Sequence, residues 1–292
     1  MSDALTPGEA LRALAAESTL QIPGAPHALA GRMIEQQGYP AAYLSGAALS
    51  AGVLGMPDVG LFTLTELVQQ ATYLTQSVNL PLLVDADTGF GDAINVERTV
   101  IELEAAGVAA IQLEDQQLPK RCGHLSGKTL VTAEDMCHKI RAAVATRCDE
   151  SLVIIARTDA RGVDGWDAAV DRARQYIDAG ADWIFPEALA DADEFRRFAE
   201  TINAPLVANM TEFGKSPLLA YDELAQFGYA AVLYPVTLLR ITMKAIEMAL
   251  AVIGVDGTQS ELLDVMQTRQ ELYDLLGYDD YEDRDRSYFS GE

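Results

Sequence analysis

The chain alternates eight times between a short apolar run and a longer amphipathic pattern, and this alternation restricts its fold more than any other feature. The short runs are typical of buried strands and the longer patterns of helices. Strands are expected at residues 20–23, 41–45, 80–85, 109–114, 152–157, 183–186, 206–209 and 231–234. Helices are expected at residues 6–17, 27–37, 64–77, 96–106, 133–146, 166–179, 192–201 and 221–227. This order predicts an α/β fold, a (β/α)8 TIM-type barrel.

Glycine recurs where an expected helix gives way to the next strand, at Gly38, Gly107, Gly180 and Gly228. A left-handed helix cap requires glycine at such a position. The repeat favours a barrel over the alternative, a doubly wound open sheet, because no Gly-rich dinucleotide fingerprint follows the first strand.

Residues 1–292 are expected to form a single barrel domain, with residues 237–292 as a C-terminal helical extension. Two further helices are expected after the last strand, at 237–253 and 259–276. A barrel needs only the first of them to cover its last strand. The apolar side chains of the second helix therefore need another partner, unless the helix simply covers the bottom of the barrel.

Polar residues follow most of the expected strands, at the barrel end where active sites lie. They are Ser45, Gly46, Asp85, Asp87, Glu114, Asp115, Arg157, Asp159, Glu187, Asn209, Thr211 and Glu212. One such residue would be read as a helix cap or a solvated loop residue. So many on neighbouring strands predict a polar mouth that binds a ligand.

Asp85 and Asp87 are the most specific pair in this mouth. A strand period of two would point both side chains the same way. No histidine stands beside them, and Asp58 and Glu114 add further oxygen atoms. Such ligands suit Mg2+ better than zinc, so we expect Asp85, Asp87 and Glu114 to hold Mg2+, with Mn2+ as a substitute. The alternative is a pair of caps before an ordinary turn at Gly89.

After the fourth expected strand the chain enters Lys120-Arg-Cys-Gly-His124, where a thiol stands among cationic and imidazole neighbours. Such a setting lowers the pKa of a thiol and holds it near a bound anion. An inert cysteine is the plainer alternative. The polar, basic loop favours an active role for Cys122.

Arginines near the strand ends are candidate ligands for substrate carboxylates, because the guanidinium group binds them in a bidentate manner. Arg157 ends the fifth strand, Arg240 follows the eighth, and Arg269 lies further along the chain. Arg240 and Arg269 could equally be surface charges of helices. Ser45 and Gly46 offer a hydroxyl and backbone N–H groups to an anion.

The segment from Lys120 to His124 resembles the signature loop of the isocitrate lyase/phosphoenolpyruvate mutase superfamily, specifically its 2-methylisocitrate lyase branch. Residues 184–188, 233–235 and 266–273 resemble the same branch, and the resemblance runs from about residue 7 to about residue 281. It implies a Mg2+-dependent carbon–carbon lyase that splits a tricarboxylate into succinate and pyruvate, in the methylcitrate cycle of propionate catabolism. It also implies that an Asp-x-Asp pair holds Mg2+, that arginines hold substrate carboxylates, and that a homotetramer forms by helix exchange.

The reaction expected is a retro-aldol (Claisen-type) cleavage. A base removes the substrate's hydroxyl proton, and Tyr43 and Asp58 are both candidates between which the sequence does not choose. Cys122 then donates a proton to the carbanion, while Lys120 and His124 tune the thiol. The expected substrate-binding residues are Ser45, Gly46, Ala47, Cys122, Gly123, Arg157, Glu187, Asn209, Thr211, Arg240 and Arg269.

Three rival functions remain open from the sequence. An isocitrate lyase would release glyoxylate in place of pyruvate. A phosphonate or carboxyphosphonate mutase of the same superfamily would need no cysteine and would survive replacement of Cys122 by serine. A non-enzymatic scaffold would not bind Mg2+.

The net charge of −23 argues against nucleic-acid binding, because phosphates would be repelled. No run approaches the roughly 20 apolar residues of a membrane helix, and residues 1–7 do not resemble a signal peptide, so no membrane association is expected. Three widely spaced cysteines indicate a reducing cytoplasm. The excess of acids, with five lysines against 16 arginines, predicts an acidic, halophilic-type surface suited to concentrated salt.

Overall fold

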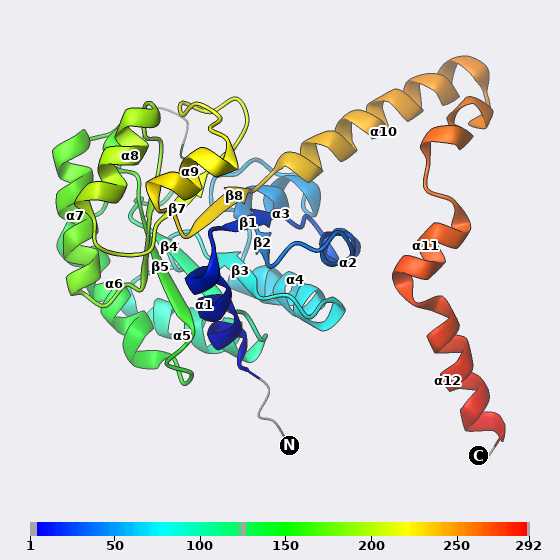
Figure 1. Ribbon diagram of the computed structural model, residues 1–292, viewed down its shortest axis with the longest axis horizontal. Coiled ribbons are helices and arrows are strands. Elements are labelled where there is room, and N and C mark those ends of the chain that lie inside the picture. The colour runs from blue at the N-terminus through cyan, green and yellow to red at the C-terminus, as the bar shows by residue number, and fades with distance from the viewer. Residues whose placement is uncertain (1–4, 122, 124–126, 291–292) are drawn as a thin grey trace.

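Within residues 5–121, 123 and 127–290, which the computed structural model describes, eight parallel strands form the expected barrel (Figure 1). They are β1 (Leu20–Pro23), β2 (Ala42–Leu44), β3 (Leu82–Asp85), β4 (Ala110–Glu114), β5 (Val153–Thr158), β6 (Trp183–Pro186), β7 (Val207–Asn209) and β8 (Ala231–Tyr234). Strands β2 to β6 pair in sequence order, and β1, β8 and β7 pair in a second group. Bridges from Gly24 to Tyr43 and from Ile184 to Leu206 join the two groups, so the sheet closes on itself.

Apart from the first, which precedes β1 and packs its Leu11 among the barrel-interior side chains, the helices follow the strands and cover the outside of the barrel (Figure 1). They are α1 (Pro7–Glu17), α2 (Ala28–Gln36), α3 (Gly46–Gly52), α4 (Leu64–Ser77), α5 (Ala93–Ala105), α6 (Ala133–Thr146), α7 (Trp166–Asp178), α8 (Ala192–Thr201) and α9 (Tyr221–Phe227). Thr6 and Thr63 begin α1 and α4 with complete capping boxes. The junction residues Gly38, Gly107 and Gly180 take φ of 79°, 82° and 106°, so the expectation of left-handed turns there is confirmed.

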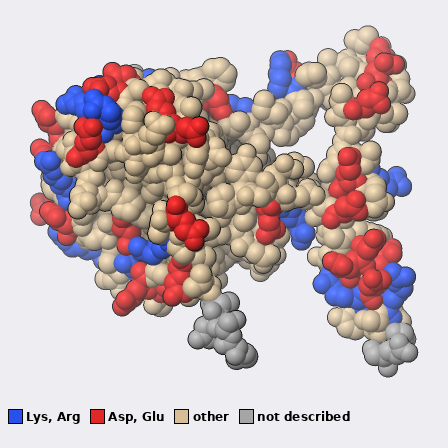
Figure 2. All heavy atoms as spheres, viewed as in Figure 1, with Lys and Arg blue, Asp and Glu red and all other residues tan. Residues whose placement is uncertain are grey.

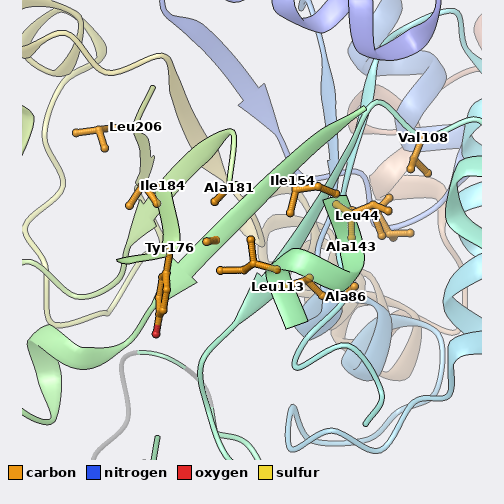
Figure 3. Close-up of a cluster of buried hydrophobic side chains, with 14 of the residues drawn as sticks. Leu44, Ala86, Val108, Leu113, Ala143, Ile154, Tyr176, Ala181, Ile184 and Leu206 are labelled. Carbon is orange, nitrogen blue, oxygen red and sulfur yellow. The ribbon is translucent and has the colours of Figure 1, made fainter. Parts of the chain in front are cut away.

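Side chains alternate between two apolar cores along each strand. Leu82 and Val84 of β3 pack outward against the helices, whereas Leu83 lies in the barrel interior. Figure 3 shows part of the outer cluster, including Leu113 and Ile154. The strand period therefore points every second side chain toward the barrel axis, and the last inward positions before the mouth carry the polar residues.

The C-terminal extension leaves the barrel as α10 (Thr237–Asp256) and continues through a 3-10 helix (Ser260–Val265), α11 (Arg269–Leu276) and α12 (Tyr278–Ser290) (Figure 1). The prediction of one helix over 259–276 is wrong, because Thr268 caps a separate helix with Glu271. The sequence analysis also missed α3 and α12. The extension contacts α2, where Arg32 Nη1 donates to the carbonyl of Leu275 at 3.3 Å.

Helix α10 is 20 residues long, and none of them is buried in the described chain. Its apolar side chains, among them Ile241, Ile246 and Leu250, are exposed. No helix in the described segments is long and apolar enough to cross a membrane.

Candidate active site

A pocket with a cavity volume of about 80 Å³ opens at the carboxyl ends of the strands. Its lining residues are Tyr43, Ser45, Ala47, Asp58, Asp85, Lys120, Arg121, Gly123, Arg157, Phe185, Glu187, Asn209, Thr211, Leu233, Pro235, Val236 and Arg240. Most of the residues selected from the sequence therefore meet in one place. Cys122 and His124, on which the acid role and its tuning were predicted, lie outside the described residues.

The two aspartates of the expected metal site meet at one point, but not for the reason given by the strand period. Strand β3 ends at Asp85, and Asp87 beyond it takes a left-handed backbone with φ of 48°. A Cβ built on Gly46 would lie 3.1 Å from Asp87 Oδ1 and 3.2 Å from Asp85 Oδ2. Both carboxylates therefore face the start of α3. Left-handed geometry in a residue other than glycine costs energy and recurs at functional sites.

Lys120 places a positive charge among these acids. Its Nζ lies 2.8 Å from Asp87 Oδ1 and also bonds Asp58 Oδ1. Burial raises the pKa of Asp87 to about 7, with Lys120 opposing the rise and Asp85 adding to it. Burial alone would lower the pKa of Lys120, but Glu114 and Asp87 raise it well above its usual value. The ammonium group is thus held charged beside the aspartates.

Arg157 lies at the centre of a buried cluster of acids. Its Nε lies 3.0 Å from Asp159 Oδ2 and 3.4 Å from Glu114 Oε2, and its Nη1 lies 3.2 Å from Glu187 Oε2. The guanidinium group also lies 5.2 Å from the ring centroid of Phe185. Burial alone would lower the pKa of Arg157, but Asp159, Glu187 and Glu114 raise it well above its usual value. This arginine is a fixed cation in the pocket wall.

Gly123 rests against this cluster. A Cβ added there would lie 2.2 Å from Arg157 Nη2 and 2.6 Å from Glu187 Cγ, so only glycine fits. Lys128, which is buried, donates to the carbonyl of Gly123 and to Asp159 Oδ1, the latter at 2.6 Å. The loop after β4 is therefore anchored at Gly123 over the mouth of the barrel.

The predicted anion contact at Ser45 and Gly46 is partly contradicted by these contacts. The backbone N–H of Gly46 donates to Asp85 Oδ2 at 3.1 Å, and Ser45 Oγ accepts from the N–H of Ala48 at 3.4 Å as the cap of α3. Both groups therefore form hydrogen bonds within the protein. The prediction was wrong on this point because the helix that begins at Gly46 was not expected from the sequence. Ser45 and Ala47 still line the pocket.

The far wall contributes the neutral hydrogen-bonding groups. Asn209 Nδ2 donates to Glu187 Oε2 at 3.1 Å, while Asn209 Oδ1 is buried without a hydrogen-bond partner among the described residues.

The two arginines predicted beyond the last strand lie in different places. Arg240 donates to the carbonyl of Glu212 at 2.7 Å and lies 2.9 Å from its Oε2. Arg269, at the start of α11, is not among the lining residues of this pocket, because the extension has left the barrel before that position.

Several residues of the site were not predicted from the sequence, namely Gln112, Arg121, Lys128 and the apolar wall of Phe185, Leu233, Pro235 and Val236. Gln112 could have been found from the period of β4, since it lies two residues before Glu114 on the inward face. Lys128 reaches the site only through the path of the loop, and no local pattern marks it.

The acid set fits a bound Mg2+ with few direct carboxylates. Among the described residues no group of three or more His, Cys, Asp or Glu side chains is placed to enclose a metal ion. Mg2+ does not need such a cage, since it keeps several waters and takes one or two carboxylates. Glu114 Oε1 is buried without a hydrogen-bond partner in the described chain, and such an oxygen suits a metal-bound water. Burial raises the pKa of Glu114 well above its usual value.

A closed parallel barrel with acids, a buried arginine and an anchored loop at the carboxyl ends of its strands is the arrangement of a TIM-barrel enzyme. The comparisons with known proteins specify the class further. A family model described as phosphoenolpyruvate phosphomutase matches residues 11–253. The chain belongs to this family, and the resemblance to the isocitrate lyase/phosphoenolpyruvate mutase superfamily is confirmed.

Curated relatives match nearly the whole chain. A protein of Aeropyrum pernix named 2-methylisocitrate lyase is 54% identical over 96% of this chain and 90% of its own length. The Escherichia coli protein of the same name is 45% identical over 96% and 95%. Among solved structures, 2,3-dimethylmalate lyase matches with a TM-score of 0.91 at 33% identity, covering 98% of this chain and 96% of its own. Phosphonopyruvate hydrolase in complex with oxalate and Mg2+ matches with a TM-score of 0.88 at 28% identity, covering 98% and 100%.

Proposed function

We propose that the chain is a carbon–carbon lyase that cleaves 2-methylisocitrate to pyruvate and succinate. The observation that carries this proposal is the near full-length similarity, 45–54% identity, to curated proteins named 2-methylisocitrate lyase. The pocket supports it chemically. The positively charged residues Lys120, Arg121, Arg157 and Arg240 line the pocket together with an apolar wall of Phe185, Leu233 and Pro235, against which a methyl group would be buried.

Asp85, Asp87 and Glu114 are the residues that would hold Mg2+. When bound, the ion would supply positive charge that stabilises the 2-oxo product as it develops. Arg157 and Arg240 would bind substrate carboxylates, and Asn209 and Thr211 would donate or accept neutral hydrogen bonds. A base would accept the substrate's hydroxyl proton as the carbon–carbon bond breaks, and Asp58 is one candidate. Tyr43, the other candidate, could do so only as a phenolate, which burial disfavours by raising the pKa of Tyr43 well above its usual value. The electron pair of that bond would remain on the succinyl carbon, to which Cys122 would give a proton.

Product analysis by NMR tests this function directly. The protein is incubated with Mg2+ and either 2-methylisocitrate or isocitrate. Pyruvate and succinate from the first substrate are the expected result. Glyoxylate from isocitrate alone would indicate isocitrate lyase, and no cleavage of either would leave the phosphonate chemistry of the superfamily as the next substrate class to assay.

Added Mg2+ is expected to stabilise the protein. A ligand at 100 times its Kd that binds only the folded state adds about 2.7 kcal/mol to the free energy of unfolding. For a chain of this size that corresponds to a rise of roughly 5–10 °C in Tm. Thermal melts with Mg2+, Mn2+ and EDTA measure it. An Asp87→Asn variant serves as the control and should lose most of the rise, whereas an unchanged rise would remove Asp87 from the metal site.

We propose further that the protein is a homotetramer formed by helix exchange, in the cytoplasm. Supporting observations are the exposed apolar side chains of α10 and the groove beside it, which Met56, Phe213 and Leu250 help to line. Arg269 lies on the exchanged extension, so its proposed contact with substrate requires a neighbouring subunit. Light scattering distinguishes four chains of 31.5 kDa from one, and Ile246→Glu should break the assembly.

The acidic surface supports a proposal of adaptation to salt. Figure 2 shows acidic side chains spread over the barrel and gathered on the extension. Lys120, Lys128 and Lys139 are buried, which leaves Lys215 and Lys244 as the surface lysines. Because salt screens repulsion among exposed acids, Tm should rise by roughly 5–10 °C between about 0.1 M and about 2 M KCl. Equal Tm values across the series would contradict the proposal.

A further inference from the structure

Three side chains form a continuous hydrogen-bonded chain beneath the pocket. The Tyr43 hydroxyl lies 2.8 Å from Gln112 Oε1, and Gln112 Nε2 lies 3.1 Å from Asp85 Oδ1. All three residues are buried, with Gln112 1% exposed and Tyr43 2% exposed. Tyr43 and Asp85 line the pocket, whereas Gln112 connects them from below. Pairing of β3 with β4 places Gln112 directly opposite Asp85, which fixes this contact in the register of the barrel.

The direction of every hydrogen bond in this chain follows from Asp85. Its Oδ2 accepts the N–H of Gly46 at 3.1 Å, and its Oδ1 accepts the N–H of Asp87 at 3.2 Å. A carboxylate only accepts, so the Gln112 amide must turn its NH2 group toward Asp85. The hydrogen-bond partners of this amide therefore determine which of its two ends is the oxygen and which is the nitrogen.

The orientation of the Gln112 amide also fixes the hydrogen of the Tyr43 hydroxyl. With its NH2 group on Asp85, Gln112 presents Oε1 to Tyr43, and the Tyr43 hydroxyl must donate its hydrogen to that oxygen. The phenolic oxygen then retains only lone pairs for a ligand in the pocket. Tyr43 can accept a hydrogen bond from a substrate hydroxyl but cannot donate one to a substrate carboxylate.

We propose that Gln112 is a positioning residue that performs two tasks at once. It fixes the Asp85 carboxylate for the divalent cation, and it fixes Tyr43 as a hydrogen-bond acceptor for the substrate's hydroxyl group. The second task rests on the proposed function, whereas the first does not. Partners that hold a metal ligand in place matter for affinity, and their loss commonly weakens metal binding by about 10–100-fold.

The first test is a calorimetric titration of Mg2+ into substrate-free protein. Gln112→Met retains the approximate volume but removes both hydrogen bonds, so its Mg2+ affinity should fall by about tenfold or more. Tyr43→Phe leaves the donor to Asp85 in place and should bind Mg2+ as the parent does. Tyr229→Phe removes a buried hydrogen bond to the carbonyl of Phe195, outside the pocket lining, and controls for general loss of packing. Unchanged Mg2+ affinity in a folded Gln112→Met protein would overturn the first task.

The second test is a double-mutant cycle in kcat for cleavage of 2-methylisocitrate. If Gln112 acts through Tyr43, Gln112→Met should lower kcat by about tenfold or more in the parent but by less than about threefold in a Tyr43→Phe background, at saturating Mg2+. Equal reductions in both backgrounds would overturn the second task. Should the parent cleave no tricarboxylate, the proposed function fails while the Mg2+ titration still decides the role of Gln112 at Asp85.

Discussion

Replacement of Cys122 with serine should lower kcat for cleavage by about 10²–10⁴-fold, the range contributed by a positioned general acid. A serine hydroxyl is a far weaker acid than a thiol and would not protonate the carbanion at a useful rate. The next residue, Gly123, rests against Arg157 and Glu187 in the pocket lining, which supports a role for this loop in the chemistry. Steady-state kinetics with both proteins measures the loss, and calorimetry should show unchanged binding of Mg2+ and succinate.

A glycine variant of the same loop provides an independent check. Gly123→Ala would place a methyl group against Arg157, which its own acids prevent from moving, so the loop must shift and kcat should fall although the thiol remains. Gly162→Ala is the matched control, because its nearest neighbour would be Lys128 Nζ at an ordinary 3.6 Å. A Cys122→Ser enzyme that retains full activity would refute the acid role and favour the mutase chemistry.

Replacement of Arg157 with methionine should both remove activity and destabilise the fold. It leaves Asp159, Glu114 and Glu187 buried without their shared cation, and breaking such a buried cluster costs about 3–5 kcal/mol. Loss of a fixed cation in the pocket should lower kcat/KM by a further 10²–10³-fold or so. Urea unfolding and steady-state kinetics measure the two effects separately.

Arg157→Lys separates charge from geometry. An ammonium group restores the charge but not the planar array that reaches three acids, so it should recover part of the stability and little of the activity. Parental kcat/KM in Arg157→Lys would show that the position supplies charge alone. Parental stability in Arg157→Met would show that the three acids do not depend on this arginine.

The barrel could be predicted from the sequence because the apolar strand runs, the amphipathic helix patterns and the four junction glycines all indicated the same repeated strand–helix unit. Strand bounds differ from the predictions by at most two residues, for example residues 80–85 against Leu82–Asp85. Helix α3 was missed because Ser45, which caps it, was interpreted as a ligand for an anion. In the extension, the break at Thr268 was overlooked although the capping box of Thr268 with Glu271 is a local signal in the sequence.

The site was predictable wherever a strand ends in a polar residue, and less so elsewhere. Of the two acids after β4, Glu114 faces Arg157, whereas Asp115 accepts hydrogen bonds from Thr158 and Tyr176 and supports the packing of α7. These two acids cannot be distinguished from the sequence alone, because it does not show which of them points into the barrel. Gln112 was missed because a polar residue within an apolar run resembles an exception to a pattern, although it lies on the inward face.

The proposed reaction of this barrel is cleavage of 2-methylisocitrate with the aid of a divalent cation. The most direct measurement compares kcat/KM for 2-methylisocitrate and isocitrate, each with saturating Mg2+ and after treatment with EDTA. The apolar wall predicts a preference of roughly 10–200-fold for the substrate with the extra methyl group, and no cleavage without the metal. A preference for isocitrate, or cleavage that persists in EDTA, would contradict it.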